Sequence, residues 1–196
     1  MSGLPNRRPL LAALLADRPE NLLVVSSLGS PTWDVSAAGD HPGNFCFIGA
    51  MGQAGPFALG LALAQPDRRV VLFAGDGELL MSLGVLATIA NQAPRNLAIV
   101  VLDNESYGET GGQPTATAGS TDLERVARAC GIANARTVTD ETEVDALRLL
   151  VLQADGPVLA TVKIDSERLP LAFPHSFDGA TAINRFRQAV LEPEGR

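Results

Sequence analysis

One short segment, Gly75-Asp76-Gly77, combines residue types that could bind a phosphorylated ligand through a metal ion. The glycines let the backbone turn sharply and let a ligand approach the main-chain amides closely. The helix expected after them offers free N–H groups and a positive dipole end, which favour an anion. Asp76 would repel a bare phosphate, so its carboxylate fits this position if a divalent cation bridges the two. Mg²⁺ suits that role because it prefers oxygen ligands and commonly joins carboxylates to phosphates.

Asn104 is the second candidate ligand for this cation. It follows the apolar run 97–102, which we expect to be a strand. A helix over 78–91 would travel about 21 Å at ~1.5 Å per residue, and a strand over 97–103 would return about 23 Å at ~3.3 Å per residue. Because the two lengths nearly cancel, Asn104 should arrive at the same edge of the sheet as Asp76. Its amide oxygen can bind a cation without adding charge.

An alternating pattern along the chain predicts the elements that position these residues. Short apolar runs are typical of buried parallel strands, and the first of them is closed by Gly29 and Pro31. Longer stretches rich in Ala and Leu are typical of helices. Strands that alternate with such helices predict an α/β fold, a doubly wound open parallel sheet with helices on both faces. Strands are expected at 22–26, 45–48, 70–74, 97–102, 133–138 and 157–164, and helices at 10–15, 51–65, 78–91, 141–153 and 180–191, with one more that is capped by Thr121 or Asp122 and ends at 130.

Composition limits the classes of function. The chain has 196 residues and a formal net charge of −7, and this acidic balance argues against nucleic-acid binding. No apolar stretch reaches the ~18–20 residues that span a bilayer, so we expect a cytoplasmic protein without membrane contact. Lys163 is the only lysine, and no glycine-rich segment is followed by the lysine of a phosphate-binding loop. We expect an N-terminal helix (1–21), one ligand-binding domain (22–165) and a C-terminal tail with a short helix (166–196).

Several segments, in order, resemble the cofactor-diphosphate-binding domain of thiamine diphosphate enzymes. Gly75-Asp76-Gly77, followed after 26 residues by Asn104, is similar to their metal–diphosphate motif. Other segments resemble the β subunit of the two-chain sulfopyruvate and phosphonopyruvate decarboxylase group, and the resemblance covers about residues 20–165. These segments are Ile48-Gly49-Ala50-Met51-Gly52, Leu86-Ala87-Thr88-Ile89-Ala90, and Asp103-Asn104-Glu105 through Thr110-Gly111-Gly112-Gln113-Pro114-Thr115.

The resemblance implies thiamine diphosphate and Mg²⁺ as cofactors. Asp76, the side-chain oxygen of Asn104 and the main-chain carbonyl of Ser106 would hold Mg²⁺. The two catalytic candidates are Gly49, whose carbonyl would accept from the 4′-amino group of the cofactor, and Met51, the apolar wedge that would keep the cofactor bent. That bend would place the amino group against the thiazolium C2–H, which makes proton removal intramolecular. The remaining cofactor-binding candidates are Gly29, Ser30 and Thr32 after the first strand, Gly75, the amides of Gly77 and Glu78, and Tyr107.

The implied activity is decarboxylation of a small anionic 2-oxo acid to an aldehyde and CO₂. The resembling enzymes activate the aminopyrimidine with a Glu on a separate pyrimidine-binding domain, and the residues before Leu22 are too few for such a domain. We therefore expect a partner (α) subunit that supplies this Glu, in an α₂β₂ assembly. Two alternatives stay open: a non-catalytic cofactor-binding or regulatory subunit, and a subunit of a thiamine-dependent carboligase or acyl-transfer enzyme.

Individual motif residues also have ordinary structural interpretations. Asp76 could cap a helix, Met51 could fill the core, and the side chain of Glu78 could point to solvent with only its amide used. Tyr107 could order a loop, and Gln113 and Thr115 could face the substrate because glycine-rich loops near strand ends often carry binding groups.

Overall fold

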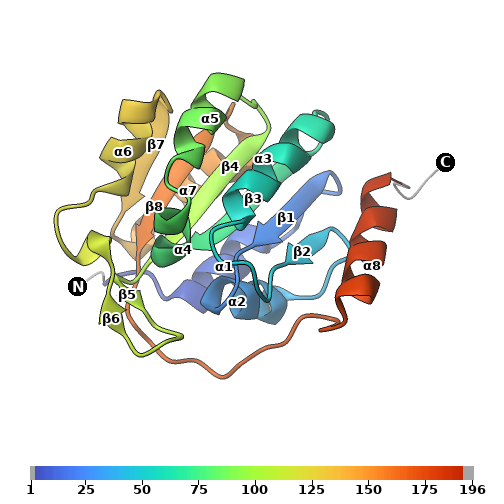
Figure 1. Ribbon diagram of the computed structural model, residues 1–196, viewed down its shortest axis with the longest axis horizontal. Coiled ribbons are helices and arrows are strands. Elements are labelled where there is room, and N and C mark those ends of the chain that lie inside the picture. Colours follow the sequence, from blue (N-terminus) through green and yellow to red (C-terminus); the bar gives the residue numbers. More distant parts are fainter. Residues whose placement is uncertain (1–2, 192–196) are drawn as a thin grey trace.

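Six parallel strands form the central sheet of the protein (Figure 1). The computed structural model describes residues 3–191. Every residue of β1 and β4 is buried, as expected for parallel strands in a sheet covered on both faces. In spatial order the strands are β2 (Asn44–Cys46), β1 (Leu22–Ser26), β3 (Arg69–Gly75), β4 (Leu97–Asp103), β8 (Val158–Lys163) and β7 (Asn134–Val138).

Helices cover both faces of this sheet. In β4, Leu97 and Ile99 belong to one buried core, whereas Ala98 and Val100 belong to the other. Successive side chains of a strand point to opposite faces, so each central strand contributes to two cores. The predicted α/β fold, with a doubly wound parallel sheet, is therefore confirmed. One face carries α3 (Ala54–Ala64), α4 (Asp76–Met81), α5 (Val85–Gln92), α6 (Leu123–Cys130) and α8 (Gly179–Leu191), and the other carries α1 (Arg7–Leu15), α2 (Ser30–Ala38) and α7 (Val144–Gln153).

Helix α2 lies where the sequence pattern predicts only the end of a strand. Gly29 is its N-cap, with φ of 78°, and Pro31 lies in its first turn. A glycine adopts this backbone conformation at little cost, and a proline in the first turn loses no helical hydrogen bond. The same residues that close the strand therefore also begin a helix.

The helix expected over 78–91 is divided into α4 and α5. Helix α4 begins two residues earlier, at Asp76, and ends at Met81. Its C-cap residue is Ser82, whose N–H donates to the Leu79 carbonyl (3.1 Å). The tight turn that follows leads into α5. Both short helices pack on the same face of the sheet, so the division changes the direction of the chain without changing the layer.

The helix expected over 51–65 begins only at Ala54. Ala50 and Gly52 have φ of 57° and 87°. These left-handed conformations cannot continue a right-handed helix, so the residues before Ala54 form a turn. This turn is placed at the edge of the sheet where β1 and β3 end.

The order of the strands creates a switch point between β1 and β3. From β1 the chain passes outward to β2, then crosses back to β3 and continues to β4. The connections after β1 and β3 leave on opposite faces, because α2 and α4 belong to different layers. In open α/β sheets, ligands bind outside the carboxyl ends of the strands at such a point.

A small hairpin lies beside this edge of the sheet. It pairs β5 (Ser106–Tyr107) with β6 (Gln113–Pro114) in antiparallel fashion and continues into a 3₁₀ turn, η1 (Ala116–Ala118). A second 3₁₀ turn, η2 (Glu141–Glu143), precedes α7. Figure 1 shows the hairpin below α4, at the end of the sheet where β3 and β4 finish.

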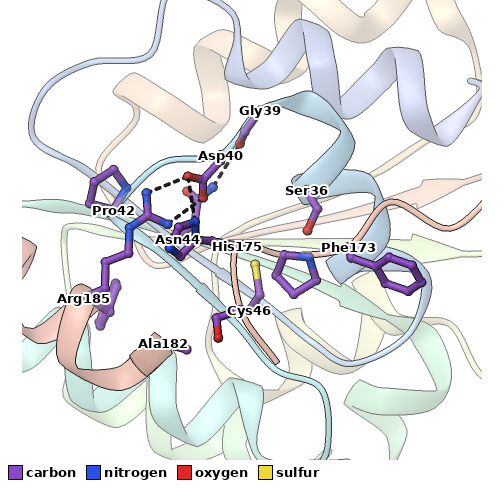
Figure 2. Close-up of a pocket in the computed structure, with 13 residues that line it drawn as sticks. Ser36, Gly39, Asp40, Pro42, Asn44, Cys46, Phe173, His175, Ala182 and Arg185 are labelled. Atoms are coloured by element: carbon purple, nitrogen blue, oxygen red, sulfur yellow. Dashed lines mark hydrogen bonds and ion pairs between the residues drawn. The ribbon is translucent and has the colours of Figure 1, made fainter. Parts of the chain in front are cut away.

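After β8 the chain crosses the molecule as an irregular segment and ends in α8 beside β2 (Figure 1). The Arg185 guanidinium of α8 donates to both carboxylate oxygens of Asp40, at 2.7 and 2.6 Å, and Phe186 packs against Phe45. A small cavity of about 50 Å³ lies at this junction, and Cys46 and His175 are among its lining residues (Figure 2). The helix expected at 180–191 is thus present. The division of the chain at residues 21 and 165 stays a prediction.

Within residues 3–191, no helix combines the length and the apolar character needed to cross a membrane.

Candidate active site

A pocket of about 370 Å³ lies at the carboxyl ends of β1, β3 and β4. This volume falls in the range typical of small-molecule sites, roughly 300–1,000 Å³. Most of the residues predicted from the sequence line it together, although they come from distant parts of the chain. They are Ser30, Met51, Gly75, Asp76, Gly77, Glu78, Asn104, Ser106 and Tyr107.

The structure does not bring Gly29, Thr32 and Gly49 to the lining of this pocket. Thr32 is fully buried, and its hydroxyl lies 2.9 Å from the Ser27 carbonyl and 2.8 Å from the Phe47 carbonyl. Its side chain therefore serves the fold. Gly29 lies between Leu28 and Ser30, which do line the pocket, and Gly49 lies two residues before Met51, which also lines it.

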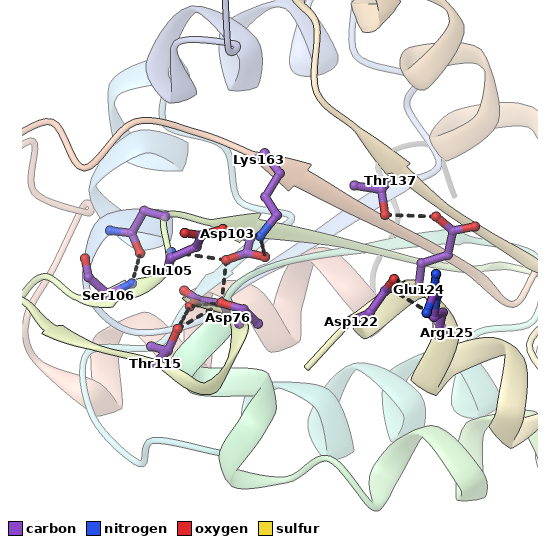
Figure 3. A network of polar contacts seen from close by, with 12 residues as sticks. Asp76, Asp103, Glu105, Ser106, Thr115, Asp122, Glu124, Arg125, Thr137 and Lys163 are labelled. Atoms are coloured by element: carbon purple, nitrogen blue, oxygen red, sulfur yellow. Dashed lines mark hydrogen bonds and ion pairs between the residues drawn. The ribbon is translucent and has the colours of Figure 1, made fainter. Parts of the chain in front are cut away.

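Asp76 is a buried carboxylate at the start of α4, and only 2% of its surface is exposed. The hydroxyls of Thr115 and Thr117 lie 2.5 and 3.0 Å from its Oδ2 atom (Figure 3). Burial raises the pKa of Asp76 above its ordinary value, and the nearby Asp103 carboxylate adds to that rise. The threonine hydrogen bonds lower the pKa of Asp76 without offsetting burial. Burial thus disfavours the charged form of this carboxylate.

Asp103, at the end of β4, is equally buried and differs from Asp76 in having a cation beside it. Lys163 Nζ lies 2.8 Å from Asp103 Oδ2 and 2.7 Å from Glu105 Oε1. Partial burial lowers the pKa of Lys163, but its bonds to Asp103 and Glu105 outweigh this effect and raise it. Among residues 3–191, no Lys, Arg or His nitrogen lies within 4.0 Å of the Asp76 carboxylate. Asp76 therefore lacks the cationic partner that Asp103 has.

Asn104 and Ser106 bring further oxygen atoms to the same pocket. Asn104 follows β4, and its Oδ1 atom accepts a hydrogen bond from the Ser106 N–H (3.2 Å). The Ser166 hydroxyl donates to the Asn104 carbonyl (3.0 Å), which fixes the turn from the side of the C-terminal segment. A carboxylate, an amide oxygen and a main-chain carbonyl are all hard ligands, so the donor set suits Mg²⁺.

Side chains that typically bind transition metals do not cluster in the described residues. In the part of the chain that the structure describes, no group of three or more His, Cys, Asp or Glu side chains could hold a metal ion. The set formed by Asp76, Asn104 and Ser106 contains only one side chain of those types, so its donors are the kind that bind Mg²⁺ together with phosphate and water.

Gly77 lies directly beneath the ring of Tyr107. A Cβ atom at position 77 would be 2.5 Å from Tyr107 Cε1 and 2.8 Å from Cδ1. A side chain at this position would therefore displace the ring, and only a glycine fits beneath it. Tyr107 also orders the hairpin, because its carbonyl accepts from the N–H of Gly112 (2.9 Å).

The side chain of Glu78 does not point to solvent, so that alternative is wrong. Glu78 is 6% exposed, and its Oε1 atom accepts a hydrogen bond from the Ala54 N–H (3.2 Å) at the start of α3. Its Oε2 atom is buried and has no hydrogen-bond partner in the structure. Glu78 thus joins the beginnings of α4 and α3.

Two methionines contribute to the apolar part of the pocket, together with Leu28, Pro31, Leu102 and Ile164. Met51 follows the left-handed residue Ala50 and is half-buried at the pocket wall. Met81 is 61% exposed, and a Cβ atom at Gly52 would lie 3.1 Å from its Cβ. The neighbouring Ile48 is 46% exposed. The pocket therefore opens onto an apolar surface.

Sequence reasoning missed several residues of the site. Arg7 from α1 is 7% exposed and is the one basic side chain among the described residues that line the pocket. Its Nε atom lies 3.4 Å from Asp34 Oδ2 and forms no hydrogen bond. The sequence pattern did not predict Thr117 and Lys163 as partners of the buried acids. Thr115, which was considered only as a residue facing the substrate, contacts Asp76. The glycine-rich segment just before the threonines was the only sequence feature that pointed to them.

Comparison with known proteins places this geometry in a family. Residues 35–162 match the model of the thiamine pyrophosphate enzyme C-terminal TPP-binding domain. The X-ray structure of a putative thiamin diphosphate-dependent enzyme from Mycobacterium smegmatis superposes with a TM-score of 0.71 at 26% identity, covering 83% of this chain and 32% of that chain. The fold and the site thus define the cofactor-binding domain of a thiamine diphosphate enzyme, and the chain belongs to that family.

Within the family, the chain belongs with the sulfopyruvate and phosphonopyruvate decarboxylases. It is 43% identical over 145 residues to the sulfopyruvate decarboxylase subunit beta of Methanothermobacter thermautotrophicus, covering 74% of this chain and 75% of that protein. It is 37% identical over 197 residues to the phosphonopyruvate decarboxylase of Streptomyces viridochromogenes, covering 96% of this chain and 47% of that protein. The chain therefore spans about half the length of the phosphonopyruvate decarboxylases that it matches.

Proposed function

We propose that this chain is the diphosphate-binding (β) subunit of a two-chain 2-oxo acid decarboxylase that depends on thiamine diphosphate and Mg²⁺. Its substrate would be sulfopyruvate or phosphonopyruvate, and its products the corresponding aldehyde and CO₂. The observation that carries this proposal is Asp76, a buried carboxylate without a cationic partner among the described residues, at a pocket that it shares with Asn104 and Ser106.

In this proposal the chain binds and orients the cofactor. Asp76 Oδ, Asn104 Oδ1 and the Ser106 carbonyl hold Mg²⁺, which offsets the burial of the Asp76 charge. The amides of Gly77 and Glu78, two residues that line the pocket, bind the diphosphate at the start of α4. These amides belong to the first turn, so no hydrogen bond within the helix has to break, although the Gly77 N–H also donates to the Asp76 carboxylate.

The apolar wall and the nearby turn have separate roles in the proposal. Met51 supports the cofactor in its bent form, and the Gly49 carbonyl accepts a hydrogen bond from its amino group. When bound, thiamine diphosphate supplies the electron sink for loss of CO₂, and the protein supplies geometry and electrostatics.

The partner and the substrate class rest on the relatives and on one residue. Relatives at 34–43% identity are named sulfopyruvate decarboxylase subunit beta, which supports a partner (α) subunit. We assign to that partner the activating Glu, in a cytoplasmic α₂β₂ assembly. Arg7, a buried cation at the pocket, supports an anionic ligand there.

The first experiment measures cofactor binding. Isothermal titration of thiamine diphosphate in the presence of Mg²⁺ should give saturable binding to the assembled protein, and Asp76→Asn should weaken it at least about tenfold, since loss of a charged ligand removes more than 1.4 kcal/mol. Asp122→Asn is the matched control, because Asp122 caps α6 away from the pocket. Equal binding by wild type and Asp76→Asn would refute the proposed metal site.

The second experiment measures turnover with the partner subunit. Sulfopyruvate, phosphonopyruvate and pyruvate are supplied separately, and CO₂ release is expected from at least one of the two dianionic substrates. Tight cofactor binding without CO₂ release would favour a regulatory subunit. Product formation only after an acceptor aldehyde is added would favour carboligation.

A further inference from the structure

Thr115 and Thr117 form a bridge between the hairpin and the two buried acids. Both threonines are 5% exposed, and their hydroxyl oxygens lie 2.9 Å apart. Thr115 Oγ1 lies 2.5 Å from Asp76 Oδ2, and Thr117 Oγ1 lies between the acids, 3.0 Å from Asp76 Oδ2 and 2.7 Å from Asp103 Oδ1 (Figure 3). These contacts span 39, 41 and 14 residues of sequence.

Both hydroxyl contacts to Asp76 end on the same carboxylate oxygen. The threonines therefore fix the orientation of the carboxylate through Oδ2 and do not occupy Oδ1. Each hydroxyl carries one proton, so two protons serve three contacts with carboxylate oxygens. The hydroxyls orient the Asp76 charge without fully compensating it, which leaves the carboxylate receptive to a cation.

The same threonines hold a second part of the proposed metal site. Ser106, whose carbonyl is a proposed ligand, pairs with Pro114 in the hairpin, directly before Thr115. The Thr115 N–H donates to the Glu105 carbonyl (3.0 Å), which closes the hairpin from the other side. Thr115 is therefore joined both to the carboxylate of Asp76 and to the strand that carries Ser106.

We propose that Thr115 and Thr117 are positioning residues of the divalent-cation site: their hydroxyls orient Asp76 and hold the Ser106 strand at the distance that the cation needs. This inference rests on the proposed function. The ion pair between Lys163 and Asp103 completes the bridge by anchoring Thr117 to the end of β8. Outer partners of this kind orient metal ligands, and their loss typically weakens metal binding by about 10–100-fold.

The test removes each hydroxyl without changing the shape of the side chain. Thr115→Val, Thr117→Val and the double variant are prepared in the full chain together with its partner subunit. Mn²⁺ in place of Mg²⁺ is titrated in the presence of thiamine diphosphate, and free Mn²⁺ is measured by electron paramagnetic resonance. Each single valine variant should bind Mn²⁺ about 10–100-fold more weakly. Thr115→Ser and Thr117→Ser keep the hydroxyl and should restore binding close to that of wild type.

Thr137→Val is the matched control. The Thr137 hydroxyl donates to a carboxylate oxygen of Glu124 (2.8 Å), so the same chemical group is removed from a threonine–carboxylate pair outside the pocket (Figure 3). This variant should bind Mn²⁺ like wild type. Urea unfolding of all variants measures stability separately from affinity.

Each outcome bears on a different claim. Lower stability with unchanged Mn²⁺ affinity in the valine variants would show a purely structural role and overturn the inference. Equal losses with valine and serine would do the same, because the hydroxyl would then not matter. Absence of Mn²⁺ binding by wild type would instead refute the proposed function. If a valine variant does not fold, alanine at that position removes the hydroxyl without placing a methyl group against the carboxylate.

Discussion

Single residues at the carboxyl edge of the sheet show how buried charge is managed. Asp103 has Lys163 beside it, whereas the partners of Asp76 are neutral hydroxyls. A buried carboxylate costs free energy unless it is paired, so the second arrangement is costly without a bound cation. The unfavourable free energy of burying Asp76 arises at the pocket, where a cation bound with a phosphorylated ligand would offset it.

Glu78 provides a prediction about stability. Replacing Glu78 with Ala leaves the buried Ala54 N–H without its acceptor, which should lower the free energy of unfolding by about 1–3 kcal/mol. Glu78→Gln retains an acceptor oxygen and should cost less. Urea unfolding followed by circular dichroism measures both variants. An equal loss for Ala and Gln would show that the negative charge, and not the hydrogen bond, stabilises this junction.

Gly77 and Tyr107 provide a prediction about coupling. Gly77→Ala should be destabilising, because its Cβ would overlap the Tyr107 ring, and overpacking typically costs about 1–3 kcal/mol. In a Tyr107→Ala background the overlap is gone, and Gly77→Ala should stabilise α4 by up to about 1 kcal/mol through its higher helix propensity. A double-mutant cycle by thermal unfolding measures the difference. Additive effects would contradict the contact between the two positions.

At the scale of elements, the last helix is attached mainly through its side chains. Helix α8 packs Phe186 against the aromatic rings of Phe45 and Phe57, and Arg185 binds Asp40 near the start of β2. The irregular segment that leads to α8 lies against Trp33, whose ring is 5.8 Å from that of Phe173. The attachment of α8 therefore includes these aromatic contacts and this ion pair, together with a hydrogen bond from Arg68 to the Ala189 carbonyl (3.3 Å).

The ion pair of α8 should make this attachment sensitive to acid. The hydrogen bonds from Arg185 hold the pKa of Asp40 below its ordinary value of 3.8. Because the pKa of Asp40 is lower in the folded state, the ion pair stabilises α8 fully at pH values above the ordinary pKa. This stabilisation is lost as the pH falls through the pKa of Asp40 in the folded state. Hydrogen exchange of residues 179–191, corrected for intrinsic rates, should increase on acidification below pH 3.8.

The expected effect is small, about 0.2–1 kcal/mol of local stability, because the pair is partly exposed. Asp40→Asn is the control for this prediction. It should raise exchange in α8 near neutral pH and remove most of the further increase in acid. An acid response of the same size in Asp40→Asn would assign the effect to other carboxyl groups.

At the scale of the whole molecule, the pocket is bordered by apolar surface. Met81 lines it and is exposed, and the chain spans about half the length of the phosphonopyruvate decarboxylases that it matches. If the proposed partner covers the pocket, Met81→Asp should weaken assembly at least about fivefold, since an apolar side chain that anchors an interface contributes more than about 1 kcal/mol.

Leu149→Asp is the matched control for this assembly prediction. Leu149 has an exposed fraction of 54%, similar to the 61% of Met81. It lies on α7, on the opposite face of the sheet. It should associate with the partner subunit like wild type in analytical ultracentrifugation. Equal weakening by both variants would indicate a general effect of surface charge, and no effect of Met81→Asp would place the interface elsewhere.

The sequence by itself determined the class of fold and the centre of the candidate site. Continuous apolar runs identify buried parallel strands because burial on both faces allows no polar alternation. The edge of the sheet at which Asp76 and Asn104 meet follows from the lengths of one helical stretch and one strand. That helical stretch is divided into two helices, yet Asp76 and Asn104 still line one pocket, because both helices stay within a single layer.

Only the tertiary structure decided which side chains hold the site together. Thr115 meets Asp76 across 39 residues, Lys163 meets Asp103 across 60, and Glu78 meets the Ala54 amide across 24. The Thr32 hydroxyl does not line the pocket but donates to the Phe47 carbonyl, 15 residues further along the chain. Many side chains can satisfy a buried charge or hydroxyl, and local pattern does not distinguish among them. The choice depends on which groups the packed layers bring within about 3 Å, and that is a property of the whole fold.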